Sequence, residues 1–336
     1  MSHAHSLRST ASGRTTPAAL SRRALLGSLG AAGLAATFTA FAPTAAQAAT
    51  STKRLTFGVA NPGGPLDSSY LSSLTSLVGE APRLLEFYKD FRQPAPVSEI
   101  SAALNAGARP VITWEPWAAD GGLTQPGYSM ASIAAGAFDG YLNSWASALA
   151  PYGDSVSIRF AHEMNGNWYP WCPGVNGTTA ADYVAAWRHV WAVLAAGGAT
   201  PRWIWSVNDP YPGSVPLDQV YPGNDVVTEL ALDSYNFGTS QSWSTWKTPS
   251  QVFAPGLSAL RALGTGKSIL VSETASSELG GSKPNWIRDG IAYLDAQADV
   301  SGFIWFDFLK ETDWRINSST ASSTAFRKAL ASRSTV

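Results

Sequence analysis

The sequence predicts a single (β/α)₈ barrel that follows an N-terminal export signal. Three observations lead to this prediction: eight short apolar segments occur after residue 50, helical patterns separate them, and no second domain or internal repeat is visible. Apolar strands that alternate with helices are typical of a parallel sheet covered by helices. Eight such units between residues 55 and 308 match a closed barrel.

The eight segments are rich in β-branched and aromatic residues. They span residues 55–60, 84–88, 110–114, 156–160, 203–207, 230–235, 268–272 and 303–308. After the fourth segment, apolar residues recur at spacings that place them on one helix face: Tyr183, Ala186, Trp187, Val190, Trp191 and Leu194. A doubly wound open sheet is the alternative, but the turn at residues 61–64 lacks the glycine pattern that binds a dinucleotide. The pattern therefore favours the barrel.

Residues 1–48 have the pattern of an export signal. They contain four arginines, no lysine and no acidic residue, and Arg22 and Arg23 form a twin-arginine pair. An apolar stretch rich in Ala and Gly follows, and a small-residue cleavage site ends at Ala48. We therefore expect a Tat-type signal peptide and a secreted catalytic barrel over residues 49–336. A retained membrane anchor is the alternative, although the apolar stretch is short for a spanning helix.

The mature chain is mildly acidic, because removing the four signal arginines leaves 19 basic against 24 acidic side chains. Such a surface has no electrostatic reason to bind nucleic acid or an anionic membrane, so we expect neither partner. The 14 tryptophans are typical of proteins that stack sugar rings on aromatic faces, and also of large cores. Cys172 is the single cysteine and has no disulfide partner. We expect a monomer.

The sequence indicates neither a cofactor nor a zinc site. His3 and His5 leave with the signal, and His189 falls within a helical pattern. The remaining histidine, His162, cannot form a zinc site alone. A calcium ion held by carboxylates stays open.

Polar residues collect where the predicted strands end, which is where (β/α)₈ enzymes place their catalytic groups. They are Glu115, Glu163, Asn208, Asp209, Asp233, Asn236, Glu273 and Asp307. So many carboxylates would repel each other if they served structure alone. An acidic, aromatic-lined barrel mouth suits the cleavage of a neutral sugar polymer.

Glu163 and Glu273 follow the fourth and seventh strands, which lie across the barrel mouth from each other. A retaining glycosidase needs two carboxyl groups roughly 5 Å apart, one to donate a proton and one to attack the anomeric carbon. These two residues fit that requirement.

Residues 159–169, which read RFAHEMNGNWY, resemble the acid/base motif of glycoside hydrolase family 26. That family includes β-mannanases, lichenase-type β-glucanases and β-1,3-xylanases, and belongs to a clan of retaining (β/α)₈ enzymes with catalytic Glu on strands four and seven. Weaker resemblances follow in the same order along the chain: residues 114–117, 182–191, 205–208, 221–224 and 271–273.

The resemblance implies roles for individual residues. Glu163 is expected to be the acid/base, with a raised pKa, and Glu273 the nucleophile, with Glu278 as a less favoured rival. His162 is expected to contact the sugar near the cleavage point. Tyr235 is expected to donate a hydrogen bond to the nucleophile.

Further aromatic and polar residues are candidates for substrate binding. We expect Trp305 to form the floor at the cleavage point, and Trp168 and Trp171 to be platforms in the loop after the acid/base. Plain packing in the core is the alternative for each aromatic side chain. Four more residues are candidates for subsites or for structural roles: Trp114, Glu115, Asn208 and Asp233.

The sequence therefore predicts a secreted retaining glycosidase that acts on a β-linked polysaccharide, most simply an endo-β-1,4-mannanase. A β-1,3-1,4-glucanase or a β-1,3-xylanase of the same family is the alternative. An inactive barrel that binds glycan is the alternative from another class, and the pair of glutamates argues against it. A metal-dependent hydrolase is disfavoured by the shortage of histidines.

Overall fold

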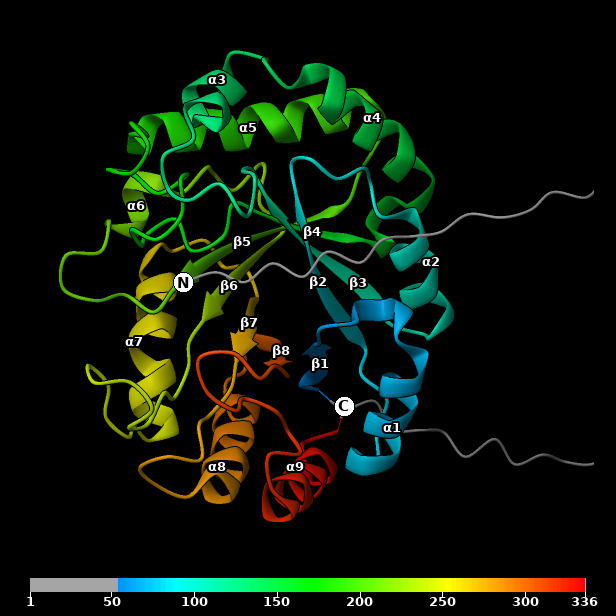
Figure 1. Cartoon of the computed structure of the whole chain (residues 1–336), viewed down its shortest axis with the longest axis vertical. Helices are drawn as coiled ribbons and strands as arrows, with labels where there is room; N and C mark the ends of the chain where they lie inside the picture. Colours follow the sequence, from blue (N-terminus) through cyan, green and yellow to red (C-terminus); the bar gives the residue numbers. More distant parts are fainter. Residues whose placement is uncertain (1–53, 336) are drawn as a thin grey trace, which may run out of the picture. The chain divides into compact units, whose positions relative to one another are not determined.

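The computed structural model describes residues 54–335, so the expected signal over residues 1–48 lies outside the described residues. Within them, eight parallel strands close into one barrel in sequence order (Figure 1). The strands are β1 (Thr56–Ala60), β2 (Leu84–Asp90), β3 (Arg109–Glu115), β4 (Ser157–Phe160), β5 (Arg202–Asn208), β6 (Glu229–Asp233), β7 (Ile269–Thr274) and β8 (Val300–Phe306). The predicted (β/α)₈ barrel is confirmed.

Strand ends differ from the prediction in ways that matter for the site. β3 and β7 extend far enough to include Glu115 and Glu273. β6 ends at Asp233 and β8 at Phe306, so Tyr235 lies in the loop after its strand. The pairing of β7 with both neighbours shifts register near its end, which is a common way to redirect a side chain beside an active site.

Helices surround the barrel and join successive strands (Figure 1). They are α1 (Ser68–Val78), α2 (Val97–Asn105), α3 (Met130–Ala134), α4 (Asp139–Leu149), α5 (Ala180–Ala196), α6 (Leu217–Val220), α7 (Pro249–Ala262), α8 (Lys283–Asp295) and α9 (Thr320–Ser332). The long helix α5 begins at a capping box formed by Thr179 and Asp182, which ends the loop after β4. No helix in residues 54–335 combines the length and apolarity needed to span a membrane.

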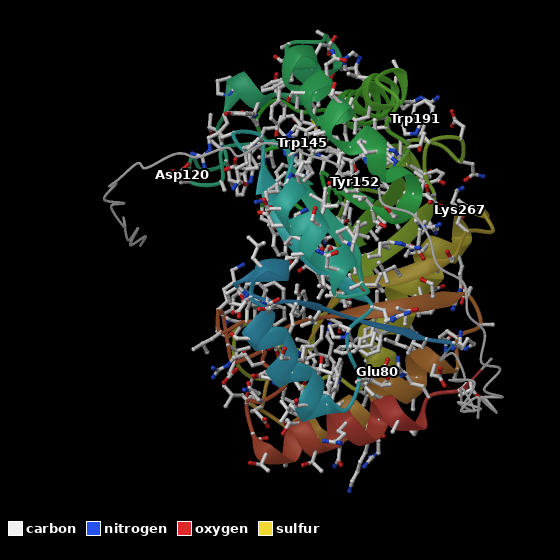
Figure 2. The ribbon with its side chains drawn as sticks, turned by 90° about the vertical axis from the view of Figure 1, so that its right-hand side faces the viewer. Glu80, Asp120, Trp145, Tyr152, Trp191 and Lys267 are labelled. Carbon is white, nitrogen blue, oxygen red and sulfur yellow. The ribbon has the colours of Figure 1, made fainter. Side chains whose placement is uncertain are left out.

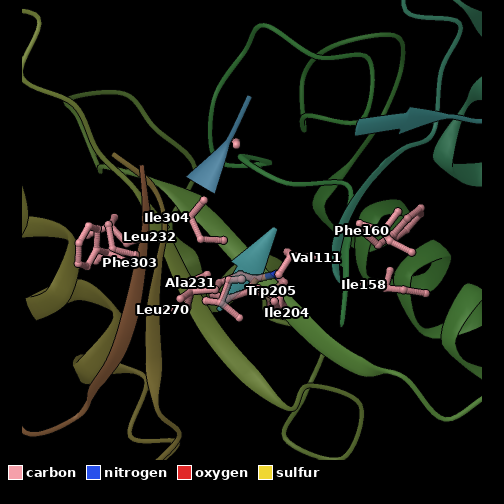
Figure 3. Close-up of a cluster of buried hydrophobic side chains, with 14 of the residues drawn as sticks. Val111, Ile158, Phe160, Ile204, Trp205, Ala231, Leu232, Leu270, Phe303 and Ile304 are labelled. Atoms are coloured by element: carbon pink, nitrogen blue, oxygen red, sulfur yellow. The ribbon is translucent and has the colours of Figure 1, made fainter. Parts of the chain in front are cut away.

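Each strand is buried on both faces, and alternate residues face different layers. Val111, Ile204 and Leu270 lie together inside the barrel, whereas Phe160 and Leu232 lie toward the surrounding helices (Figure 3). This period of two follows from the pleat of a strand. It decides which side chains reach the barrel interior and which are confined between strand and helix.

Two labelled residues distinguish the amino end of the barrel from its carboxyl end. In the side view of Figure 2, Asp120, after β3, and Lys267, before β7, lie at opposite ends. All strands run in parallel from the Lys267 end to the Asp120 end. The Asp120 end is therefore the carboxyl end, where a (β/α)₈ enzyme has its active site.

Candidate active site

Glu163 lies in a strained turn directly after β4. Ala161 and Glu163 both adopt left-handed backbone conformations, with φ of 46° and 52°, which are uncommon for residues other than glycine. Ala161 N–H donates to the Trp114 carbonyl oxygen at 3.0 Å, and Glu163 N–H donates to the Ser206 carbonyl oxygen at 2.9 Å. Such strain costs about 1–3 kcal/mol per residue and is common at active sites. The neighbouring strands therefore hold the turn in place.

The Glu163 side chain is buried against a tryptophan. Only 8% of the residue is exposed, and Trp168 Nε1 donates to its Oε2 at 2.7 Å. Gly166 permits this contact, because a Cβ atom there would lie 2.6 Å from the Trp168 ring. Burial, followed by the negative charges of Asp233 and Glu273, raises the pKa of Glu163 well above its ordinary value. This setting favours the protonated form that a general acid needs.

Glu273, on β7, accepts hydrogen bonds from three donors. Tyr235 OH donates to Oε2, Tyr88 OH donates to Oε1 at 3.0 Å, and Arg159 Nη1 donates to Oε1 at 2.8 Å. The guanidinium stabilises a negative charge on Glu273, and the two hydroxyls fix its direction. The contact expected between Tyr235 and Glu273 is present.

Glu278, the rival nucleophile, has a structural setting instead. Its Oε1 accepts hydrogen bonds from the hydroxyls of Ser318, Ser319 and Ser322, at 2.7–2.9 Å. These donors lie at the start of α9 and in the loop before it. Glu278 therefore fastens α9 to the segment after β7.

Arg159, in β4, is fully buried inside the barrel and contacts two further carboxyl groups. Nη1 donates to Glu86 Oε1 at 2.9 Å, and Nη2 donates to Asp233. Ser206 and Ser272 also donate to Asp233, at 3.0 and 2.6 Å. Burial raises the pKa of Asp233 to about 7 and the pKa of Glu86 well above its ordinary value, while Arg159 opposes both shifts. Protonation of part of this cluster keeps its buried charges balanced.

His162 is 2% exposed, and its Nε2 lies 3.2 Å from the Tyr169 hydroxyl. Its buried Nδ1 has no hydrogen-bond partner among residues 54–335. Burial, followed by the charge of Arg159, lowers the pKa of His162 well below its ordinary value, so the ring is neutral. A contact between His162 and a sugar stays a prediction.

The two tryptophans predicted as platforms have different settings. Trp168 is 36% exposed and lies in a stacked arrangement with Tyr211, 6.0 Å between ring centroids. Trp171 is fully buried, donates to the His162 carbonyl oxygen at 2.7 Å and stacks on Tyr169 at 4.3 Å. Trp168 can therefore present a face to a substrate, whereas Trp171 supports the turn that carries His162.

Trp114 and Trp305 face the helices, which favours for both of them the packing role that the sequence left open beside substrate binding. Trp114 is fully buried and stacks on Trp145 of α4 at 4.0 Å. Trp305 is also buried, donates to the Trp314 carbonyl oxygen at 2.8 Å and meets Phe326 of α9 edge-on. Both occupy strand positions whose pleat directs them away from the barrel interior.

Asn208 and Glu115 end their strands at the site. Asn208 N–H donates to Asn165 Oδ1 at 2.9 Å, and Asn165 Nδ2 donates back to the Asn208 carbonyl oxygen at 2.8 Å. Glu115 Oε2 accepts from Trp117 Nε1 at 3.2 Å, and burial raises the pKa of Glu115 to about 7. Asn208 thus ties the loop after β4 to β5, and its subsite role stays a prediction.

Sequence reasoning assigned no role to Arg159, Glu86, Tyr88 or Phe308. Phe308 stacks on Phe306 at 4.2 Å, and its ring lies 6.5 Å from the ring of Tyr88, which donates to Glu273. Glu86 and Tyr88 occupy alternate positions of β2. That spacing points both side chains to one face of the strand, so it could have identified them from the sequence.

Among residues 54–335, no group of three or more His, Cys, Asp and Glu side chains is arranged to hold a metal ion. The expectations of no metal and no cofactor stay predictions.

Residues 131–308, more than half of the chain, match the family model described as glycosyl hydrolase family 26. The chain belongs to this family. The resemblance drawn from residues 159–169 is thereby confirmed. The members of family 26 are glycosidases, which is the enzyme class predicted from the sequence.

Two proteins with stated activities have sequences similar to this family 26 chain. It is 35% identical over 254 residues to Endoglucanase H of Acetivibrio thermocellus, a match that covers 74% of the chain and 27% of that protein. It is 36% identical over 91 residues to mannan endo-1,4-beta-mannosidase A and B of Caldalkalibacillus mannanilyticus, which covers 25% of the chain and 17% of that protein. The matches thus span about a quarter or less of the length of these relatives.

Solved structures of family 26 share the barrel. The catalytic domain of an endo-β-1,4-mannanase from Bacillus sp. JAMB-750 matches with a TM-score of 0.64 at 18% identity, over 83% of this chain and 86% of that one. A β-mannanase from Bacteroides ovatus matches with a TM-score of 0.59 at 16% identity, over 84% and 89%. At these identities the likeness supports the fold.

Proposed function

We propose that this chain is a retaining glycosidase in which Glu163 is the acid/base and Glu273 the nucleophile. The observation that carries the proposal is the opposite setting of the two carboxyl groups. Burial and nearby negative charge favour a proton on Glu163, while Arg159, Tyr88 and Tyr235 all donate to Glu273. A proton donor paired with a carboxylate that is held in place by hydrogen-bond donors is what a double displacement requires.

In the first step, Glu163 donates its proton to the glycosidic oxygen, and a Glu273 carboxylate oxygen attacks the anomeric carbon. The bond to the leaving sugar breaks, and a glycosyl ester forms on Glu273. Arg159 and Tyr235 orient the attacking carboxylate. Trp168 stabilises the carboxylate that Glu163 becomes, because its indole N–H points at that group.

In the second step, Glu163 takes a proton from water, and the water oxygen attacks the same carbon and releases Glu273. Formation of the ester prepares Glu163 for this role. The negative charge of Glu273 is one cause of the raised pKa of Glu163. Neutralising that charge in the ester lowers the pKa of Glu163, so the residue can act as a base. Two displacements at one carbon retain its configuration.

For the substrate we propose β-1,4-mannan, cleaved within the chain. The support is the similarity to a mannan endo-1,4-β-mannosidase and to mannanase structures of the same family. Mixed-linkage β-glucan is the second candidate, because the relative that is 35% identical over 74% of the chain is named an endoglucanase.

Purified protein should be tested on mannan, lichenan, laminarin and β-1,3-xylan, with the anomer first released from each cleaved substrate identified by NMR. We expect mannan to be cleaved fastest and to release the β-anomer first. Cleavage of lichenan alone would move the assignment to glucan. Release of the α-anomer would exclude double displacement. Tight glycan binding without cleavage of any substrate would exclude the enzyme and favour a binding module.

We also propose that residues 1–48 direct Tat export and that the mature protein begins at Ala49. The support is the pattern of basic, apolar and small residues in the sequence. N-terminal sequencing of the protein recovered from the medium should start at Ala49. Replacing Arg22 and Arg23 together by Lys should retain the protein in the cell, and unchanged export would contradict the Tat route.

A further inference from the structure

A cavity of about 420 Å³ lies at the amino end of the barrel, away from the catalytic glutamates. Its lining comes from the amino ends of all eight strands, from Thr56 at the start of β1 to Ser301 near the start of β8. This volume is in the range of small-molecule sites, about 300–1,000 Å³. Val111, Ile204 and Leu270 form its inner wall, and they pack together inside the barrel (Figure 3).

Three arginines line this cavity: Arg83, Arg109 and Arg202. None of their side chains has a hydrogen bond or an ion pair with another residue of the described part of the chain, and every other arginine there has at least one. Arg202 Nε is completely buried and lacks a partner among residues 54–335. An unpaired buried donor is costly, so this arrangement favours an acceptor from outside the chain.

Like charges also meet in the cavity. Burial, followed by the positive charge of Arg202, lowers the pKa of Arg109, with Glu229 and Asp154 opposing the shift. Glu229 is the acidic residue of the lining, and its Oε1 already accepts from Ser301 and Ser268, at 2.6 and 3.1 Å. Three arginines and one glutamate give the lining residues a formal charge of +2, with Asp154 outside the lining.

We propose that this cavity binds a small divalent oxyanion, such as phosphate or sulfate, between the Arg109 and Arg202 guanidinium groups. Its two negative charges match the formal charge of +2 on the lining residues. Guanidinium groups present paired N–H donors that suit tetrahedral oxyanions. The bound anion joins the starts of β3 and β5, which are not neighbours in the barrel, and so stabilises the amino end.

The test is calorimetric titration of the purified protein with inorganic phosphate, and separately with sulfate, in a buffer free of both at constant ionic strength. We expect one saturable site for each anion and a saturable rise in the unfolding midpoint. Chloride at the same ionic strength should give neither. Absence of a saturable heat with both anions would overturn the proposal.

Arg109→Gln with Arg202→Gln should weaken binding at least about tenfold, which is about 1.4 kcal/mol. Arg288→Gln is the matched control, because this exposed arginine pairs only with its neighbours on α8, and it should bind as the unmodified protein does. If the double variant fails to fold, the exposed Arg83→Gln replaces it and should also weaken binding. The proposal would be overturned if the double variant, or Arg83→Gln in its place, bound the anions with the same affinity as the control. Cleavage of polysaccharide by the variants should be unchanged, which separates this site from the catalytic one.

Discussion

Trp168 donates its indole N–H to Oε2 of Glu163 at 2.7 Å while more than a third of the tryptophan remains exposed. One side chain therefore contacts Glu163 and also presents a surface at the barrel mouth. A sugar ring stacked on that surface would lie beside Glu163, the proposed proton donor, and its position would be coupled to proton transfer.

Trp168→Phe should shift the alkaline limb of the pH–rate profile to higher pH. The indole hydrogen bond lowers the pKa of Glu163, so its loss lets that pKa rise further and the proton is kept to higher pH. Loss of one hydrogen bond to a developing charge should reduce kcat/KM about tenfold. Trp243→Phe is the control, because Trp243 is an exposed tryptophan that packs on Phe237. An alkaline limb that stays in place would contradict this account of Trp168.

Glu273→Ala should reduce polysaccharide cleavage by roughly 10⁴-fold or more, because no other group can form the ester. Azide should then replace the missing carboxylate and give a glycosyl azide of inverted configuration from an activated aryl glycoside, identified by NMR. Glu278→Ala is the matched control and should keep its activity, since Glu278 binds the serines that begin α9. Normal turnover by Glu273→Ala would exclude it as nucleophile.

Glu163→Ala should give the opposite stereochemistry. Cleavage of polysaccharide should fall by about 10²–10⁴-fold, because a sugar leaving group needs the proton. An activated aryl glycoside should still form the ester on Glu273, which azide then opens to a glycosyl azide of retained configuration. An inverted product would mean that the two roles are exchanged.

Trp114→Phe should lower stability without changing KM. The ring lies between β3 and α4, stacked on Trp145, so trimming it leaves a gap in the core that costs about 1–3 kcal/mol. Denaturant unfolding and steady-state kinetics on one preparation separate the two effects. A large rise in KM at unchanged stability would restore Trp114 to the substrate site.

Glu115→Gln should stabilise the protein at neutral and alkaline pH. The folded-state pKa of Glu115 is about 7, above its ordinary 4.5, so the folded state holds the proton more tightly than the unfolded state. Glu115 therefore does not lower the free energy of unfolding below about pH 4.5. It lowers that free energy by up to roughly 3 kcal/mol as pH rises through 7. Glutamine removes that dependence. Unfolding free energies of the variant and the unmodified protein at pH 4.5 and 8 measure this pH dependence. An equal effect of the substitution at both pH values would contradict the assigned pKa.

The barrel and the family motif around Glu163 were predictable because both depend on local patterns. Apolar segments of strand length recur along the chain, and the motif around Glu163 combines a specific sequence with a strand end. Tyr235 was predicted from the resemblance, and its bond to Glu273 is present.

The direction of each side chain was harder to predict from the sequence. Trp114 and Trp305 lie near strand ends, yet a shift of one residue along a strand changes the face of the sheet. The environment of Glu273 depends on Arg159 and Tyr88, which are 114 and 185 residues distant in sequence. Pairings at that separation are set by closure of the barrel, and no local pattern reports them.

Arg159 makes catalysis and folding hard to improve separately. Its guanidinium donates to Glu273 at the mouth and to Glu86 and Asp233 in the interior, so any substitution of Arg159 disturbs both regions at once. An engineer who wants a more heat-resistant form should leave this residue and its carboxyl partners untouched. Solvent-facing positions on the outer helices are better targets, because changes there do not reach the reacting atoms.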